Sequence, residues 1–245
     1  MFKNYKKKSM NQNIFKSSES LKKDETECLF LNKYCLQKCY CERSHDKNII
    51  RYFIDRDIYD WEVKVYLALL DKKLTPTIRI GSALQGDLGD QQIVYHTSDK
   101  ISVYNFLLKN KDHTKFILNE IYSFVKKFNK YNFLHGNLHL HNIFVNPETF
   151  LSKGDFYVID YSNSYLFKTN RKYVTSCPEY DRVSFVGEYQ GRGEDDFYIY
   201  WDFFTLYVSL KMFLKNDGEN LVYLENLVQN YMSQNTIKKF IAYIS

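Results

Sequence analysis

The sequence contains few of the residues that interrupt regular structure, with 9 glycines and 3 prolines among 245 residues. It has no uninterrupted apolar run near the ~18 to 20 residues that a helix needs to cross a bilayer. Its N-terminal stretch carries lysines but lacks the apolar core of a secretory signal. These absences predict a cytoplasmic protein with no membrane span.

A large excess of charge of one sign is also missing, because 34 basic residues face 29 acidic ones and give a net charge of +5. This mild excess suits a phosphate-bearing ligand, but it is also ordinary for a soluble protein. No long basic stripe with interleaved aromatic residues is present, which argues against a nucleic-acid partner. The surplus of Lys, Asn, Tyr, Phe and Ile is typical of an AT-rich genome. It favours a viral or parasite-like source, for which the cytoplasm would be that of the host.

Cysteines are odd in number, at positions 28, 35, 39, 41 and 177. An odd count without a signal peptide argues for reduced thiols. Cys35, Cys39, Cys41 and His45 crowd into one short stretch, whereas zinc sites usually join two separated pairs of ligands. We therefore expect small, half-buried thiols on a hairpin at this place rather than a metal site.

The chain divides into three parts by composition. Residues 1–25 indicate a flexible basic tail, residues 26–98 indicate strands with one inserted helix, and residues 99–245 are rich in helical patterns. A strand-rich part followed by a helix-rich part is an α+β arrangement. Apolar residues make up 44% of the chain, enough for a substantial core in one large domain or in a two-lobed unit with a single cleft.

Apolar periodicity places the expected elements. Strands are predicted within 26–43, 47–55, 91–97 and 155–165. Helices are predicted at 59–73, 102–110, 114–132, 200–216, 219–232 and 235–244. The helix at 114–132 is expected to bury a face that includes Phe116, and the strand at 155–165 is expected to end in Asp160.

Four polar residues, His135, Asn137, Asn142 and Asp160, lie at a spacing that suits phosphoryl transfer. That chemistry is mostly positioning and charge neutralisation, so it needs few protein groups. It uses a carboxylate near the substrate hydroxyl, an amide oxygen five residues later and a second carboxylate at the end of the next strand. Mg²⁺ prefers hard oxygen ligands, which explains Asn and Asp at the last two places.

The pair of motifs "HGNLHLHNIFV" and "YVIDYS" resembles the protein-kinase-like superfamily. It is closest to the divergent small-molecule and lipopolysaccharide-type kinases, whose motifs read HGDLHxxN and IDF or IDY. The resemblance covers roughly residues 45–215. It implies a bilobal protein-kinase-like fold, with a strand-rich N-lobe at 26–98 and a helical C-lobe at 99–245, and it implies ATP and Mg²⁺ as cofactors.

Carried over by position, the resemblance implies that His135 is the structural histidine of the catalytic loop and that Asn142 and Asp160 bind the metal. Asp202 is similar to the buried helix aspartate that holds the loop backbone. Glu62 is similar to the glutamate that pairs with the phosphate-binding lysine. The segment 93–108 is similar to the hinge, so Val94 and Tyr95 are expected at the nucleotide. His139 and His141 are expected to be exposed or to face the cleft.

Three departures from the family pattern concern catalysis itself. Asn137 stands where the family has the catalytic aspartate, and an amide cannot accept a proton at useful pH. Arg51 aligns best with the phosphate-binding lysine, although Lys47 would align in a shifted register, and Arg and Lys are not interchangeable. No glycine precedes Gly81, whereas the family's phosphate-covering loop depends on glycine.

The departures together predict a pseudokinase with weak or absent phosphotransfer that still binds ATP and Mg²⁺ and acts through a protein partner. The alternative is an active, divergent kinase that transfers the γ-phosphate of ATP to a protein or small-molecule hydroxyl. A loose phosphoryl transition state asks little of a base, and His139 could serve in place of the missing carboxylate.

Overall fold

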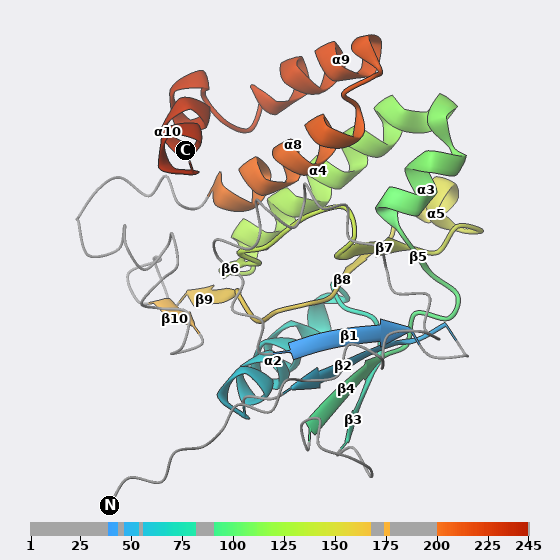
Figure 1. Cartoon of the computed structure of the whole chain (residues 1–245), viewed down its shortest axis with the longest axis vertical. Helices are drawn as coiled ribbons and strands as arrows, with labels where there is room; N and C mark the ends of the chain where they lie inside the picture. Colours follow the sequence, from blue (N-terminus) through green and yellow to red (C-terminus); the bar gives the residue numbers. More distant parts are fainter. Residues whose placement is uncertain are drawn as a thin grey trace, which may run out of the picture.

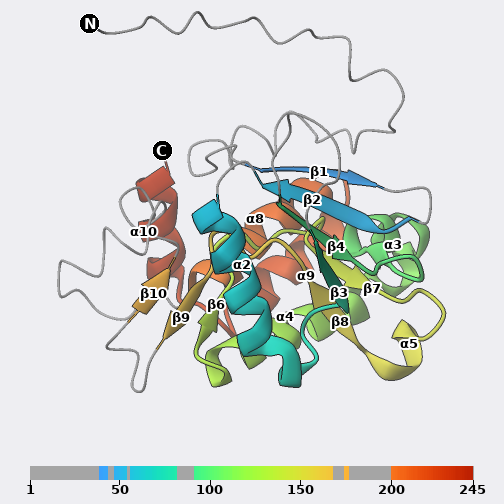
Figure 2. The same ribbon diagram turned by 90° about the horizontal axis from the view of Figure 1, so that it is seen from below.

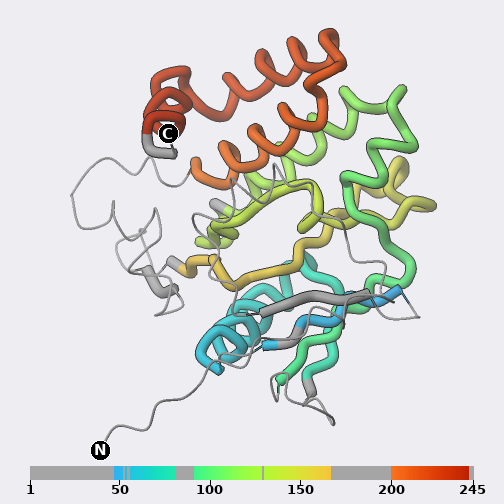
Figure 3. The backbone as a smooth tube through the Cα atoms, in the orientation of Figure 1, coloured from blue at the N-terminus to red at the C-terminus, as the bar shows by residue number. Residues whose placement is uncertain are grey.

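The computed structural model describes residues 39–43, 47–53, 56–81, 91–167, 174–176 and 200–244. It shows a mixed α and β protein with small antiparallel sheets (Figure 1). A four-stranded sheet with one helix forms one half, helices dominate the other half, and two smaller sheets lie between them. Figure 3 traces the same path as a tube, from the strands in blue and green to the last helices in red.

Several sequence predictions lie outside the described residues. The basic tail at 1–25 is one of them, and Cys35 and His45 of the cysteine-rich stretch are others. Cys39 and Cys41 do lie on a described strand, as the alternation of the sequence predicts.

The four-stranded sheet places Arg51 in the middle of an inner strand. In spatial order the strands are β1 (Cys39–Arg43), β2 (Ile49–Phe53), β4 (Gln91–Tyr95) and β3 (Ile78–Gly81). Neighbouring strands are antiparallel, and Arg51 lies between Cys41 of β1 and Ile93 of β4. The edge strand β3 was not predicted, because four residues show too few alternations to indicate a strand.

Helix α2 (Arg56–Leu69) packs on this sheet against β2 and β4 (Figure 2). Its buried apolar residues recur at helical spacing, which explains why this segment is an amphipathic helix: Ile58, Trp61, Val65 and Leu69. A 3₁₀ turn, η2 (Leu70–Lys72), ends the helix earlier than the predicted boundary at residue 73. Just beyond it, the carbonyl of Leu74 accepts a hydrogen bond of 2.7 Å from Val158 N–H, which ties this half to the other.

The helical half is built around α8 (Trp201–Phe213), which is apolar on nearly all sides and therefore buried. It contacts α4, α9 and α10. The other elements of this half are α3 (Val103–Lys109), η3 (Lys111–His113), α4 (Thr114–Lys130), α5 (Phe150–Lys153), α9 (Gly218–Val228) and α10 (Gln234–Ile244). The prediction that Phe116 lies on the buried face of α4 is wrong, since its side chain is 42% exposed.

Two three-stranded sheets bring together loops that are distant in the sequence. One has the order β5 (Ile101–Ser102), β7 (Ile143–Val145) and β8 (Phe156–Val158). The other has the order β10 (Val174–Ser176), β9 (Tyr165–Phe167) and β6 (Phe133–Leu134). The strand that was expected to end in Asp160 is β8, which ends two residues earlier at Val158, and Asp160 lies in the connection between β8 and β9.

These sheets set the loop 135–142, between β6 and β7, beside the turn that follows β8. One apolar core runs through both halves of the molecule. None of the helices within the described ranges is both long and apolar enough to cross a membrane.

Candidate functional site

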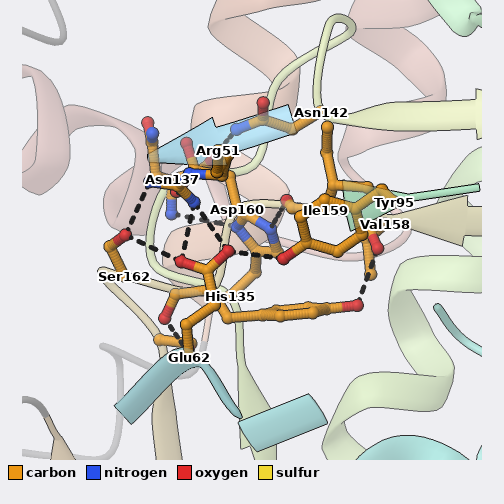
Figure 4. Close-up of polar contacts among 12 residues, drawn as sticks. Arg51, Glu62, Tyr95, His135, Asn137, Asn142, Val158, Ile159, Asp160 and Ser162 are labelled. Carbon is orange, nitrogen blue, oxygen red and sulfur yellow. Dashed lines mark hydrogen bonds and ion pairs between the residues drawn. The ribbon is translucent and has the colours of Figure 1, made fainter. Parts of the chain in front are cut away.

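The polar residues singled out by the sequence come together where the two halves meet (Figure 4). Arg51 comes from β2, Glu62 from α2 and Tyr95 from β4, all in the sheet half. The loop 135–142 and the turn 159–162 supply the remaining side chains from the other half. Direct side-chain hydrogen bonds join residues of the two halves that are 100 to 111 positions apart in the sequence.

Arg51 is the centre of this cluster. Its Nη1 donates to both carboxylate oxygens of Glu62, at 2.7 and 2.9 Å, and to Oδ1 of Asp160 at 2.6 Å. Its Nη2 donates to Ser162 Oγ at 2.8 Å. The side chain is 2% exposed, so these contacts are shielded from water. A single guanidinium therefore joins a helix of the sheet half to the turn after β8.

Glu62 is completely buried and is held from three sides. Besides Arg51, it accepts hydrogen bonds from the hydroxyl of Ser162, at 3.1 Å, and from the hydroxyl of Tyr95. Burial raises the pKa of Glu62, and the neighbouring Arg51 opposes that rise. Burial, together with the nearby Glu62, holds the pKa of Tyr95 well above its usual value, so its hydroxyl remains a donor.

Tyr95 and Val94 were predicted to lie at the nucleotide. Tyr95 is fully buried, and its hydroxyl contacts Glu62. Val94 is buried as well, and as the preceding residue of β4 it faces the opposite side of the strand. The structure brings Tyr95 into the Arg51 cluster and leaves Val94 out of it.

Asp160 adopts an unusual backbone conformation, with φ 70° in the left-handed region. A residue other than glycine adopts this region only at a cost of about 1–3 kcal/mol, which surrounding contacts must offset. Burial alone would raise the pKa of Asp160, but the guanidinium of Arg51 and the nearby His135 and His139 together outweigh it and hold the pKa below its usual value. Asp160 therefore stays ionised beside Arg51.

The loop 135–142 is fixed by its own polar groups. His135 is fully buried, which lowers its pKa and keeps the ring neutral. Its Nε2 lies 2.9 Å from the carbonyl of Ile159, so Nε2 carries the proton and Nδ1 accepts the N–H of Asn137 at 3.3 Å. Asn142 Nδ2 donates to the carbonyl of Asn137 at 3.1 Å and closes the loop on itself.

Asp202, on α8, holds the start of this loop through backbone contacts. Its two carboxylate oxygens accept the N–H groups of His135, at 2.7 Å, and of Gly136, at 2.9 Å. This is the contact that the family resemblance implies. Burial nevertheless raises the pKa of Asp202 to about 7, because the two N–H bonds offset only part of the desolvation.

Gly136 is required at its position. It has φ 79°, and a Cβ added there would lie 2.0 Å from the carbonyl oxygen of Asn163. Its own carbonyl accepts a hydrogen bond from Trp201 Nε1 at 3.0 Å. Only glycine lets the loop backbone approach the turn after Asp160 so closely.

The two other histidines of the loop were expected to be exposed or to face the cleft. His139 is buried, at 7% exposure, and lies near enough to Asp160 to lower the pKa of that carboxyl. His141 is half-buried, and its ring stacks on Tyr104 with centroids 4.4 Å apart. Among the described parts of the chain, no group of three or more His, Cys, Asp or Glu side chains is placed to hold a metal ion.

Asn142 and Asp160, the two residues expected to bind Mg²⁺, are each engaged with protein groups. The amide nitrogen of Asn142 is used within the loop, which leaves its amide oxygen as the ligand candidate. Oδ1 of Asp160 already accepts a charged hydrogen bond from Arg51. A dication on that carboxylate would lie close to the guanidinium, so the residues as arranged do not fit Mg²⁺.

Ser162, Gly136 and Trp201 are parts of the site that the sequence did not single out. Ser162 follows Asp160 by two residues, and that proximity was the only signal for it. In comparisons with known proteins, no family model matches the chain and no curated protein matches its sequence.

Proposed function

We propose that this chain is a kinase-like protein with a bilobal fold, in which phosphotransfer is weak or absent and which acts by binding a protein partner in the cytoplasm. The observation that carries the proposal is the bridge from Glu62 through Arg51 to Asp160. In protein kinases a basic residue on a strand pairs with a helix glutamate near the aspartate of the next motif. Here the residues that match those positions are in contact.

The anchoring of the loop supports the same proposal. Asp202 holds the backbone of His135 and Gly136, and His135 in turn contacts the residue before Asp160. A loop that is fixed in this way presents positions 137 and 142 at a constant distance from Asp160. That arrangement is the framework of a phosphotransfer site, with its rigid supports retained.

The chemistry within this framework is reduced. Position 137 carries a buried amide, at 5% exposure, which cannot act as a general base. Arg51 donates to two carboxylates and one hydroxyl, so a phosphate would have to displace these acceptors. With no glycine before Gly81 to form a phosphate-covering loop, three separate parts of the machinery have changed.

The second candidate function is an active, divergent kinase that uses ATP on a protein or small-molecule hydroxyl. The buried His139, which is close enough to Asp160 to affect its charge, favours this candidate. A neutral imidazole can accept a proton where an amide cannot. It would take the place of the missing carboxylate.

A transfer assay with labelled ATP separates the two candidates. The native chain is expected to transfer negligible label in the presence of Mg²⁺ or Mn²⁺, with a panel of protein and small-molecule acceptors. Robust transfer that is lost on Asp160→Ala, and is retained on Asp112→Ala at an exposed turn, would establish the active kinase instead. Asn137→Asp tests whether the carboxylate is the only missing part. If Arg51 and the missing glycine loop also limit catalysis, this variant remains inactive.

Nucleotide binding is tested separately by thermal unfolding. A ligand that binds only the folded state raises the melting temperature. We expect ATP and ADP to raise it and adenosine to raise it less. No shift with any of them would leave a kinase-like scaffold that binds its partner alone.

A further inference from the structure

The buried cluster at the junction of the two halves contains one cation and two carboxylates. Arg51 lies between Glu62 and Asp160 and donates to both from the same nitrogen. Glu62 is fully buried, whereas the side chain of Asp160 is 22% exposed. Among these three charged side chains, Asp160 is therefore the one that solvent reaches, and its carboxylate is already paired with Arg51.

Arginine is suited to this position in a way that lysine is not. Its planar fork presents several N–H donors in fixed directions, so it can serve two carboxylates and a hydroxyl at once. The arrangement uses this capacity, because Nη1 serves Glu62 and Asp160 while Nη2 serves Ser162. The hydroxyl of Ser162 accepts a hydrogen bond from Arg51 and donates one to Glu62, so the three side chains form a closed ring of contacts.

A divalent cation at Asp160 would compete with this arrangement. Mg²⁺ needs close oxygen ligands in near-octahedral geometry, and Oδ1 of Asp160 is occupied by Arg51 at 2.6 Å. The ion would also face the positive charge of the guanidinium in a largely desolvated place, where repulsion is poorly screened. Binding the metal through Oδ1 would require Arg51 to withdraw and would leave Glu62 buried without its counter-charge, whereas binding through Oδ2 would place the ion beside the guanidinium.

We infer that Arg51 is a built-in counter-cation that takes the place of a divalent metal on Asp160, so that this site binds nucleotide without a divalent cation. The inference rests on the proposed function for the nature of the ligand. An arginine at position 51, where the kinase-like pattern has lysine, then has a role of its own in binding. It supplies one fixed positive charge to the carboxylate that would otherwise recruit a metal.

Direct cation binding tests the inference without any nucleotide. Mn²⁺ is the probe, and the loss of the free-ion signal in electron paramagnetic resonance measures its binding. We expect the native chain and Asp160→Asn to bind equally little Mn²⁺ at millimolar concentration. We expect Arg51→Met to bind Mn²⁺ roughly tenfold more tightly or better, because it frees both carboxylates. Adding Asp160→Asn to that variant should abolish the gain.

Two control variants separate this effect from a general loss of positive charge. Arg79→Met makes the same substitution at an exposed position of β3 in the same sheet and should leave Mn²⁺ binding unchanged. Glu62→Gln removes the other carboxylate while Arg51 stays on Asp160, and it should not create Mn²⁺ binding. Mn²⁺ binding by the native chain that Asp160→Asn removes would overturn the inference, even if Arg51→Met does not fold.

The nucleotide arm compares the melting temperature of the native chain with ATP in EDTA and with ATP in Mg²⁺. Equal shifts in the two buffers support the inference, and a shift that needs Mg²⁺ overturns it. Its failure is distinct from that of the proposed function. A Mg²⁺-dependent shift without phosphotransfer would leave the pseudokinase proposal standing, whereas robust transfer would contradict that proposal directly.

Discussion

Asp160, which is partly exposed, and Asp202, which is buried, are held by the protein in opposite ways. Asp160 is paired with a guanidinium, and its pKa is lowered. Asp202 is held by two backbone N–H groups, and its pKa is raised to about 7. The two sites lie on either side of the same loop, since His135 contacts Ile159 at one and Asp202 at the other.

The comparison shows which part of the site depends on the identity of a side chain. The region around Asp160 depends on Arg51, so one substitution there can change the net charge of the region and its affinity for cations. The Asp202 side depends on backbone geometry, which tolerates changes in the neighbouring side chains provided that Gly136 is kept. The backbone frame of the loop can therefore stay the same while the charged side chains beside it differ.

Arg51→Met removes the ion pairs with Glu62 and Asp160 and should have the largest effect on stability. It leaves Glu62 and Asp160 without their counter-charge, and removal of one partner from a buried ion pair costs about 3–5 kcal/mol. Urea unfolding at neutral pH measures the loss in the free energy of unfolding. The control Arg79→Met, at an exposed position, should change it by less than about 0.5 kcal/mol. A loss below about 1 kcal/mol for Arg51→Met would show that the bridge is not the main support of this region.

Gly136→Ala disturbs the loop backbone that Asp202 holds, without removing any charge. The added Cβ would collide with the carbonyl of Asn163, and alanine is strained at φ 79°. We expect a loss of about 3 kcal/mol in the free energy of unfolding. Gly218→Ala is the matched control, because a Cβ at the start of α9 meets nothing within 4 Å. Similar stabilities for the two variants would contradict the close approach of loop and turn.

Asp202→Asn sharpens the comparison through its pH dependence. The folded-state pKa of Asp202, about 7, lies above its usual value of 3.8. The folded state therefore holds the proton more tightly, and the contribution of Asp202 to stability is present below pH 4 and lost as pH rises towards 7.

An asparagine in its place has no such dependence and leaves one N–H poorly bonded, at a cost of about 2 kcal/mol at low pH. The deficit of Asp202→Asn relative to the native chain should therefore shrink between pH 4 and pH 7, as measured by urea unfolding at several pH values. A deficit that grows from pH 4 to pH 7 would show that folding lowers the pKa of Asp202, as it does for Asp160, instead of raising it.

Tyr95→Phe is the mildest of these changes and tests the support of Glu62 alone. It removes one hydroxyl donor while Arg51 and Ser162 remain on the carboxylate. We expect a loss of about 1 kcal/mol in the free energy of unfolding, the usual net value of one hydrogen bond. Combining it with Arg51→Met in a double-mutant cycle should reveal coupling, since both residues contact Glu62. Strict additivity would indicate that Tyr95 acts independently of the bridge.

Long amphipathic or apolar segments were predictable from the sequence. The helices α4 and α8 lie where the periodicity and the apolar run place them, to within a few residues. The two-residue strands β5 and β6 were not predicted, because a period of two residues cannot show in so short a segment. The strand expected to end in Asp160 ends two residues earlier, at Val158. Asp160 turns the chain by a left-handed backbone conformation that its residue type does not reveal.

The candidate site was predictable only where a motif pointed to it. The resemblance pairs the positions of Arg51 and Glu62 and those of Asp202 and the loop, and the structure has both contacts. It gave no reason to place Ser162 on Arg51, because 111 residues separate them and the contact depends on how the halves pack. Nor could it show that the guanidinium would lie on Asp160, which is the feature that changes the chemistry.

The fastening of α2 at two points has a consequence for motion. Arg51 ties the helix to Asp160 through Glu62, and the backbone just past its end is bonded to β8 through Leu74 and Val158. Swinging α2 outward would break a buried ion pair and a backbone hydrogen bond together. A helix held at its middle and just beyond its C-terminal end resists such a swing, so we expect α2 to keep one orientation in the presence and in the absence of ligand. The relative position of the sheet half and the turn after β8 would then be set by folding rather than by ligand binding.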